Sequence, residues 1–284
     1  MKLSYFNISN FKIDGGAMFG VVPKVMWNKV YPADDNNLIP LALKSIVVES
    51  DGRVILVDVG FGDKLDEKFM SHVYAFGGEG LIQGLAARGY KPDDITDVVL
   101  THLHYDHCGG GTYRDVHGEL QLTFSNAKYH ISRLQWDNAV KPNAREVDSY
   151  IPENFLPLMD KGVLCLIDNE SELIPDFELR IFNGHTQGQL IPIIKYKGKK
   201  LVYTADLFPF TSHLPLPWIM SYDVEPLLTL KEKASFLNEA LVNDYTFIYQ
   251  HDFYTDCSRV YQAKKGVRAT EGFSFEQLMQ KLGE

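Results

Sequence analysis

The sequence predicts an α+β fold in which two β-sheets pack face to face and are covered by helices. Apolar, β-branched runs occur toward both ends of the chain, and helical patterns lie between them. Apolar residues make up 45% of the 284 residues, which is enough for a proper core. No repeat, low-complexity linker or other boundary signal divides the chain, so we expect one domain over residues 1–284.

The N-terminal segments read as strands joined by turns. Residues 1–13 alternate between apolar and polar side chains, as a half-buried strand does. The stretch 15–24, "GGAMFGVVPK", is too rich in glycine for a strand, and we expect it to be a loop over the mouth of a site. The runs 43–50 and 53–59 flank the dipeptide "DG" at 51–52, which predicts a β-hairpin.

A helix and a strand are expected next. Residues 79–90 have helical spacing and end near Gly89 and Pro92. Residues 95–101, "ITDVVLT", form an apolar run typical of a buried strand. Further strands are predicted at 127–132, 177–182, 190–196, 200–206 and 245–250.

Two capping boxes mark helices in the C-terminal third. Thr229 and Glu232 have the spacing of a capping box, followed by apolar residues on one helical face at 230, 234, 237 and 241. Ser274 and Gln277 repeat the pattern before a short terminal helix.

Composition and charge exclude several classes of protein. The net charge of −9, without a Lys/Arg block, argues against nucleic-acid binding. No run approaches the ~20 apolar residues needed to cross a bilayer, and the N-terminus lacks the apolar block of a signal peptide. Three isolated cysteines indicate a reducing compartment, so we expect a cytoplasmic protein without membrane or nucleic-acid partners. The sequence is compatible with a homodimer and does not test whether a leader was trimmed from a precursor.

The stretch "THLHYDHCGG", residues 101–110, holds the densest cluster of polar side chains. His102 and His104 leave the end of a predicted strand on the same side and can bind one metal ion, while Asp106 and His107 turn toward a second. The glycines at 109–111 let the backbone fold tightly around the site. Cys108 is open to two interpretations: a nucleophile, or a small buried residue behind the loop, which we favour.

A metal site needs more ligands than this loop holds, and three residues elsewhere follow predicted strands. They are His185, Asp206 and His251, each of which alone would be an ordinary turn, cap or surface residue. Asp58 also ends a strand, and we interpret it as a carboxylate that orients the ligand loop by hydrogen bonds. The remaining histidines singled out, which we expect to be surface or half-buried residues, are His72, His117 and His130.

The ordered set "HLHYDH", "GHTQG", Asp206 and His251 resembles the metallo-β-lactamase superfamily with its HxHxDH signature. The resemblance covers residues 40–255 and implies an αββα sandwich with two divalent metal ions, most simply zinc, at one edge of the sheets. It implies that the first ion binds His102, His104 and His185. It implies that Asp106, His107 and His251 bind the second ion, and that Asp206 bridges both.

Two further stretches, "DGGAMFGVVPKVMW" and "LPLPWIMSYD", are similar to quorum-quenching lactonases, which open N-acyl-homoserine lactones. The expected reaction is attack of a metal-bridging hydroxide on the lactone ester, with Asp106 carrying the proton to the leaving oxygen. Those lactonases place a tyrosine where this chain has Pro209, so either His213 or Tyr222 contacts the carbonyl instead, or the metal ions act without such a donor. The other expected contacts with this small-molecule substrate are Met18, Phe19, Tyr105, Phe208 and Trp218.

The alternative is an organophosphate or arylester hydrolase of the methyl parathion hydrolase type. The chain resembles these relatives too, because they have the same set of metal ligands. Flavodiiron oxygen reductases have a glutamate in place of His104 and a flavin domain for which no length remains. The tRNA-processing nucleases need an RNA-binding surface, which the negative charge opposes. A ligand-binding pseudoenzyme is disfavoured because all seven implied ligands are present.

Overall fold

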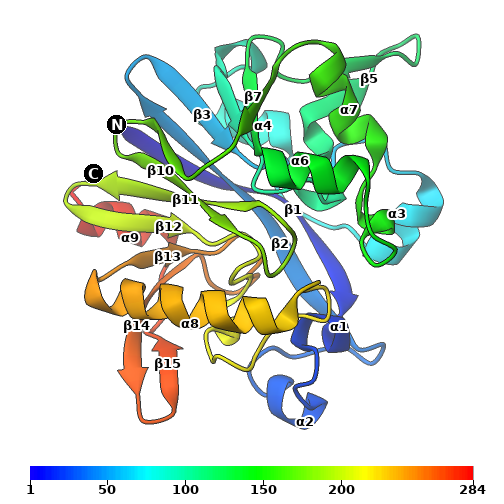
Figure 1. Ribbon diagram of the computed structural model, residues 1–284. Helices are drawn as coiled ribbons and strands as arrows, with labels where there is room; N and C mark the ends of the chain where they lie inside the picture. Colours follow the sequence, from blue (N-terminus) through cyan, green and yellow to red (C-terminus); the bar gives the residue numbers. More distant parts are fainter. Residues whose placement is uncertain (284) are drawn as a thin grey trace. The chain divides into compact units, whose positions relative to one another are not determined.

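A computed structural model describes residues 1–283 of the chain (Figure 1). The described chain divides into two compact units. Unit 1 comprises Met1–Asn10, Leu43–Asn169 and Gln187–Leu190. Unit 2 comprises Phe11–Ala42, Glu170–Thr186 and the chain from Ile191 onward. The expectation of a single domain over residues 1–284 stays a prediction.

Most strands of a six-stranded mixed sheet belong to unit 1. Its order is β1-β2-β3-β4-β7-β8, in which β2 and β3 are antiparallel and the pairs from β3 to β8 are parallel. The strands are β1 (Lys2–Asp14), β2 (Leu38–Ser50), β3 (Arg53–Val57), β4 (Asp97–Val99), β7 (Lys128–Ser132) and β8 (Leu164–Ile167). The β3 residues Ile55, Leu56 and Val57 are fully buried, as expected of a strand covered on both faces.

The turn of the β2–β3 hairpin confirms the interpretation of the "DG" pair. Asp51 and Gly52 have φ angles of 52° and 72°, and two successive positive φ values define the type I′ turn that suits the twist of paired strands. The register pairs Ser50 with Arg53 directly across this turn.

Along the chain, the helices of unit 1 come after strands of its sheet, as the colours of Figure 1 show. The predicted helix is α4, where Gly84 lies so close to the Phe6 ring of β1 that a Cβ atom would be 2.3 Å from it. Trp136 of α6 meets Phe155 of α7 edge to face, with ring centroids 5.9 Å apart. The elements outside the main sheet are α3 (Glu67–Val73), α4 (Leu81–Ala87), η1 (Pro92–Asp94), α5 (Tyr105–Cys108), η2 (Gly109–Gly111), β5 (Thr112–Arg114), β6 (Leu120–Leu122), α6 (Arg133–Val140), η3 (Val147–Ser149) and α7 (Pro152–Asp160).

Unit 2 contains nearly all of a seven-stranded sheet of order β15-β14-β13-β12-β11-β10-β9. β12 and β13 pair in parallel. β9 with β10, β11 with β12, β13 with β14, and β14 with β15 pair antiparallel. The predicted strands between 177 and 250 are confirmed. The strands are β9 (Ser171–Ile174), β10 (Phe177–Phe182), β11 (Gln189–Tyr196), β12 (Lys199–Tyr203), β13 (Thr246–Ile248), β14 (Cys257–Ala263) and β15 (Gly266–Ala269).

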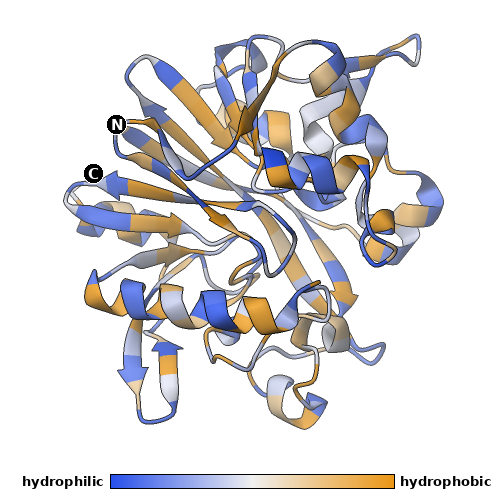
Figure 2. Ribbon diagram, in the orientation of Figure 1, coloured by the Kyte–Doolittle hydropathy of each residue, from blue (hydrophilic) through white to orange (hydrophobic). Residues whose placement is uncertain are grey.

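Helix α8 (Pro226–Val242) supplies much of the apolar cover of this sheet. Phe236 of α8 contacts Phe182 of β10 edge to face and stacks on Phe247 of β13, at centroid distances of 5.4 and 6.1 Å. Hydrophilic and hydrophobic residues alternate along α8 (Figure 2), as expected of a helix with one buried face. The other helical segments of unit 2 are α1 (Gly15–Phe19), α2 (Lys24–Trp27), η4 (Thr211–His213) and α9 (Phe275–Lys281).

One of the two predicted capping boxes is wrong. Helix α8 begins at Pro226, which suits a first helical position, so Thr229 lies inside the helix and donates to the carbonyl of Glu225. The box at Ser274 and Gln277 is confirmed, with both reciprocal hydrogen bonds present.

The expected loop at residues 15–24 is also corrected. Asp14 accepts a hydrogen bond from the backbone N–H of Ala17 at 2.8 Å and caps the short helix α1. Pro23 is the N-cap residue of the second short helix, α2, and has an extended backbone. Across the described residues, no helix is both long and apolar enough to span a membrane.

Candidate metal centre

In unit 1 the histidine cluster lies directly after β4, as the sequence predicts. His104 is the N-cap residue of α5, and Asp106 and His107 lie within this helix. Metal-ligating atoms of His102 and His104 lie within 4.8 Å of each other, and so do those of Asp106 and His107. The loop and the short helix therefore bring together two pairs of candidate ligands, His102 with His104 and Asp106 with His107.

Asp58 holds this loop in place, which confirms the role interpreted from the sequence. Its carboxylate accepts hydrogen bonds from the backbone N–H and the hydroxyl of Thr101, both at 2.8 Å. It also lies 3.0 Å from Nδ1 of His107. Because the carboxylate can only accept, Nδ1 of His107 carries the proton and Nε2 keeps its lone pair for a metal ion.

The glycines after α5 allow the backbone to pass unusually close to the end of β3. A Cβ atom at Gly109 would lie 1.9 Å from the carbonyl oxygen of Phe61, and one at Gly110 would lie 2.2 Å from that of Val59. Cys108 is fully buried, its thiol donates to the carbonyl of Leu103, and burial raises the pKa of this thiol. This supports the interpretation of Cys108 as a packing residue, because a nucleophilic thiol needs a lowered pKa.

Unit 2 brings its three predicted ligands together by itself. One carboxylate oxygen of Asp206 lies 3.1 Å from Nε2 of His185, and the other lies 3.0 Å from Nε2 of His251. The Nδ1 atom of His251 lies 2.9 Å from the carbonyl oxygen of Ala42, so this nitrogen donates and Nε2 is left to bind. All three side chains are buried.

His185 is held between two carboxylates. Its Nδ1 atom lies 3.0 Å from Asp223, on the side opposite Asp206. Burial alone would lower the pKa of His185, but Asp206 and Asp223 outweigh it and raise this pKa to about 10. The site therefore favours a positive charge at this point.

These donors fit divalent metal ions. Imidazole nitrogens and carboxylate oxygens are the ligand types that zinc and related metals bind. The rings of His107, His185 and His251 are each oriented through the nitrogen that would not bind metal. Asp206 directs its two oxygens at two different histidines, so its carboxylate would be available to bound cations on both sides.

Helix α8 supports the loop that carries His185. Glu232 accepts hydrogen bonds from the backbone N–H groups of Asn183 and Gly184, at 2.8 and 2.9 Å. Gly184 is seated so tightly that a Cβ atom would lie 2.5 Å from the backbone of Thr229. Sequence reasoning assigned Thr229 and Glu232 to a helix cap and missed Asp223, for which no local pattern gives a signal.

His130 and Asp97 correct a further expectation. His130 is buried, and its Nε2 atom lies 2.7 Å from the Asp97 carboxylate, which also accepts hydrogen bonds from Arg53. The expectation of a surface or half-buried histidine is therefore wrong for His130. It holds for His72 and His117, which are exposed.

Several side chains expected to contact substrate lie in the interior of unit 2. Phe19 stacks on Trp27 and on His213 and meets Trp218 edge to face. Nε2 of His213 donates to the carbonyl oxygen of Met18 at 2.8 Å. Burial lowers the pKa of His213 to about 3, so the ring is neutral and its one N–H is already used. Contact of His213 with a substrate carbonyl stays a prediction.

The remaining expected contacts differ in their surroundings. Phe208 is fully buried against Phe236 and Phe247, as a core residue is. Tyr105 stacks on Phe61 in unit 1, and Tyr222 of unit 2 is 39% exposed. Contact of these residues with a substrate stays a prediction.

Unit 1 also contains a cavity of about 840 Å³. Among the described residues that line it are Ile8, Phe61, Met70 and Leu81, and the predicted metal ligands are not part of this lining. This cavity therefore does not mark the candidate metal centre. The centre is assigned from the imidazole and carboxylate groups that could bind metal.

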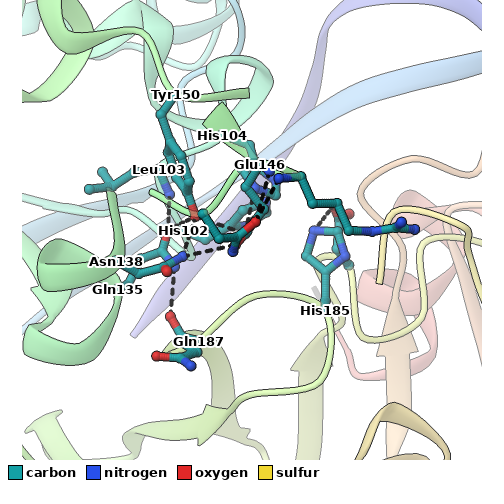
Figure 3. Close-up of polar contacts among 12 residues, drawn as sticks. His102, Leu103, His104, Gln135, Asn138, Glu146, Tyr150, His185 and Gln187 are labelled. Atoms are coloured by element: carbon teal, nitrogen blue, oxygen red, sulfur yellow. Dashed lines mark hydrogen bonds and ion pairs between the residues drawn. The ribbon is translucent and has the colours of Figure 1, made fainter. Parts of the chain in front are cut away.

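The buried residue that sequence reasoning missed most clearly is Glu146. Its Oε1 atom lies 3.4 Å from Nε2 of His104, and Tyr150 and Asn138 surround the same carboxylate (Figure 3). The chain between α6 and η3 offered no signal for this contact, because Glu146 lies 42 positions from His104.

Comparison with known proteins agrees with this geometry. The family model of the metallo-beta-lactamase superfamily matches residues 40–251. The chain is 26% identical over 176 residues to an N-acyl homoserine lactonase of Bacillus cereus, covering 58% of this chain and 63% of that protein, which is less than two thirds of its length. It is 24% identical over 231 residues to a probable metallo-hydrolase of Mycobacterium tuberculosis, covering 72% and 70% of the two chains.

Solved structures give longer matches. A probable metal-dependent hydrolase from Staphylococcus aureus has 31% identity and a TM-score of 0.87, covering 97% of both chains. A dizinc quorum-quenching lactonase, in complex with the product N-hexnoyl-L-homoserine, has 22% identity and a TM-score of 0.77, covering 96% of this chain and 95% of that one, and supports the fold alone.

The chain belongs to the metallo-β-lactamase superfamily and has its α+β fold, as the resemblance in sequence implied. It is related at low identity to N-acyl homoserine lactonases.

Proposed function

We propose that the protein is a hydrolase with two divalent metal ions, most simply zinc, that opens the ester ring of an N-acyl-homoserine lactone. The single observation that carries the proposal is the geometry of Asp206, whose two oxygens face the Nε2 atoms of His185 and His251. The relationship to lactonases supports the choice of a lactone over other esters. A cytoplasmic location and quorum quenching are part of the same proposal.

We assign the ligands residue by residue. His102, His104 and His185 would hold one ion, Asp106, His107 and His251 the other, and Asp206 both. Bound ions of this kind supply a nucleophilic hydroxide at neutral pH and polarise the ester carbonyl. Asp58 and Asp223 orient the rings of His107 and His185 through the nitrogens that do not bind metal.

Asp106 is the proposed proton carrier. Its side chain is 15% exposed, in contrast to the buried histidines around it, so it can face both the nucleophile and the leaving group. In the proposed reaction hydroxide would add to the carbonyl carbon and the ring C–O bond would break. Asp106 would take the proton of the added hydroxyl group and pass it to the leaving alkoxide oxygen, which leaves a carboxylate and an alcohol. The product is the ring-opened hydroxy acid.

A substrate panel tests the proposal. Purified protein is assayed against lactones of several acyl-chain lengths, paraoxon-like triesters, a β-lactam and pre-tRNA, and its metal content is measured after preparation without chelator. We expect about two transition ions per chain and the highest kcat/KM on a lactone. A clear preference for triesters would replace the lactonase proposal with the organophosphate hydrolase, and absence of metal after supplementation would reject both.

The substitution Asp206→Asn tests the shared carboxylate. It removes the charge that both histidines face, so we expect turnover to fall by several orders of magnitude and the metal content to fall with it. Asp244→Asn, a change of the same chemistry at an aspartate paired with surface Lys199, is the matched control and should retain activity. Full metal content and near-normal turnover in Asp206→Asn would show that the assignment is wrong.

A further inference from the structure

Glu146 is a buried carboxylate surrounded by hydrogen-bond donors. It lies between α6 and η3 in unit 1 and is 3% exposed. Its Oε1 atom lies 3.4 Å from Nε2 of His104 and accepts from the hydroxyl of Tyr150 at 3.0 Å. Its Oε2 atom accepts from the side-chain amides of Asn138 at 3.1 Å and Asn143 at 2.5 Å. Figure 3 shows Glu146 with His104, Asn138 and Tyr150 around it.

The burial of this charge has a cost that these donors must offset. Removing a carboxylate from water costs several kcal/mol even after the protein relaxes, unless hydrogen bonds replace its hydration. The two oxygens of Glu146 meet donors on both sides, so the carboxylate is solvated by side chains. If Glu146 served only to stabilise the fold, Tyr150, Asn138 and Asn143 could supply its hydrogen bonds, and a contact with His104 would not be needed.

The contact determines which nitrogen of His104 carries the proton. A carboxylate only accepts hydrogen bonds, so Nε2 of His104 must be the protonated nitrogen when it donates to Glu146. In a neutral imidazole the other nitrogen, Nδ1, then keeps the lone pair that a metal ion requires. The ring of Tyr150 lies 5.0 Å from the His104 ring and limits its rotation.

The same network reaches the backbone between the two histidines. The side-chain oxygen of Gln135 accepts from the backbone N–H of Leu103 at 3.1 Å and lies 3.2 Å from the hydroxyl of Tyr150. The side-chain amide of Gln135 donates to the carbonyl of Gln187 at 2.6 Å (Figure 3). The segment from His102 to His104 is thus held through both its backbone and a ring.

We propose that Glu146 is a positioning residue for metal binding: its hydrogen bond to Nε2 of His104 holds the ring in the tautomer and orientation that present Nδ1 to an ion. This inference rests on the proposed function, because it takes His104 as a metal ligand. Glu146 itself binds neither metal nor substrate. Carboxylates that orient ligating histidines typically contribute 10- to 100-fold to metal affinity.

The test is a metal titration of Glu146→Gln, which keeps the size of the side chain but removes its charge. Metal-free wild type and variant are titrated with zinc in competition with a chromophoric chelator, and the cobalt-loaded forms are compared by visible absorption. We expect the affinity for the more weakly bound ion to fall about 10- to 100-fold and the cobalt spectrum to change.

Asp97→Asn is the matched control. Asp97 is also a buried carboxylate bonded to Nε2 of a buried histidine, His130, but that histidine is not a predicted ligand. We expect this variant to lose stability and to keep the zinc affinity and cobalt spectrum of wild type. If Glu146→Gln does not fold, Tyr150→Phe removes one donor from the same carboxylate and should weaken zinc binding by a smaller factor.

The outcomes separate this inference from the proposed function. Zinc affinity of Glu146→Gln within about twofold of wild type, with an unchanged cobalt spectrum, would overturn the positioning role, since such roles carry at least a tenfold effect. An equal loss of affinity in Asp97→Asn would also overturn it, because the effect would then reflect general destabilisation. A wild type that binds no ion would reject the proposed function instead.

Discussion

Asp97, in β4, is held by three kinds of donor. Its carboxylate accepts from Nε2 of His130 at 2.7 Å, from Nε of Arg53 at 2.7 Å and from the hydroxyl of Thr96 at 2.7 Å. Burial alone would raise the pKa of Asp97, but the hydrogen bonds from His130, Arg53 and Thr96 outweigh it and hold this pKa well below its usual range.

This shift predicts a specific pH dependence of stability. Because the pKa of Asp97 is lower in the folded than in the unfolded chain, its contribution is fully present above the unfolded value of about 3.9. It is lost as the pH falls below that value toward the folded pKa. Asp97→Asn leaves His130 and Arg53 without the buried carboxylate, so we expect a loss of about 3 kcal/mol at pH 7.

The measurement is denaturant unfolding of the metal-free protein between pH 7 and pH 3. We expect the difference in unfolding free energy between wild type and Asp97→Asn to shrink as the pH falls below about 4. A difference that stays constant over this range would contradict the assigned cause.

At the scale of elements, the N-terminal half of α8 and the loop after β10 form one supported structure. Glu225 donates its backbone N–H to the carbonyl of Gly184 at 3.0 Å, and Val224 donates to that of His185 at 3.1 Å. Glu232 accepts from the N–H groups of Asn183 and Gly184. The loop therefore depends on the helix for its backbone hydrogen bonds.

Glu232→Ala tests this dependence. It leaves two backbone N–H groups without their carboxylate acceptor, so we expect the free energy of unfolding to fall by about 2 kcal/mol or more. Because the loop carries His185, we also expect weaker metal binding. Lys231→Ala, at the exposed neighbouring position of the same helix, is the control and should change stability by less than about 0.5 kcal/mol. Equal stability of the two variants would contradict the role of Glu232.

At the scale of the whole molecule, metal binding should appear as stability. The carboxylate of Asp206 and the rings of His185 and His251 are buried together, and a bound cation would offset the negative charge there. An ion that binds only the folded chain stabilises it by about 4 kcal/mol when free metal is 1,000 times the Kd.

Chelation is the corresponding experiment. We expect the unfolding midpoint of the wild type to fall when zinc is removed by a chelator and to recover when zinc is restored. In Asp206→Asn the same treatment should change the midpoint much less. Identical midpoints of wild type with and without zinc would contradict a resident metal centre.

The sequence by itself determined those features whose partners are close along the chain. His102, His104, Asp106 and His107 lie within six consecutive positions, so one pattern identifies them together. The β2–β3 hairpin was predictable because its turn is two residues long and needs positive φ angles that Asp51 and Gly52 tolerate. The strand ends at His185, Asp206 and His251 were predictable as positions, and the resemblance supplied their shared role.

Only the tertiary structure decided which side chains contact the predicted ligands. Glu146 meets His104 across 42 positions and Asp223 meets His185 across 38, and no local pattern relates such partners. The Thr229–Glu232 spacing matched a capping box, yet Pro226 starts the helix a turn earlier and frees Glu232 to accept from the His185 loop. His213 looked like a free donor in the sequence, but packing directs its one N–H to the carbonyl of Met18. A buried polar group takes whichever partner the folded chain brings within hydrogen-bond distance, and that distance is set by packing rather than by spacing along the chain.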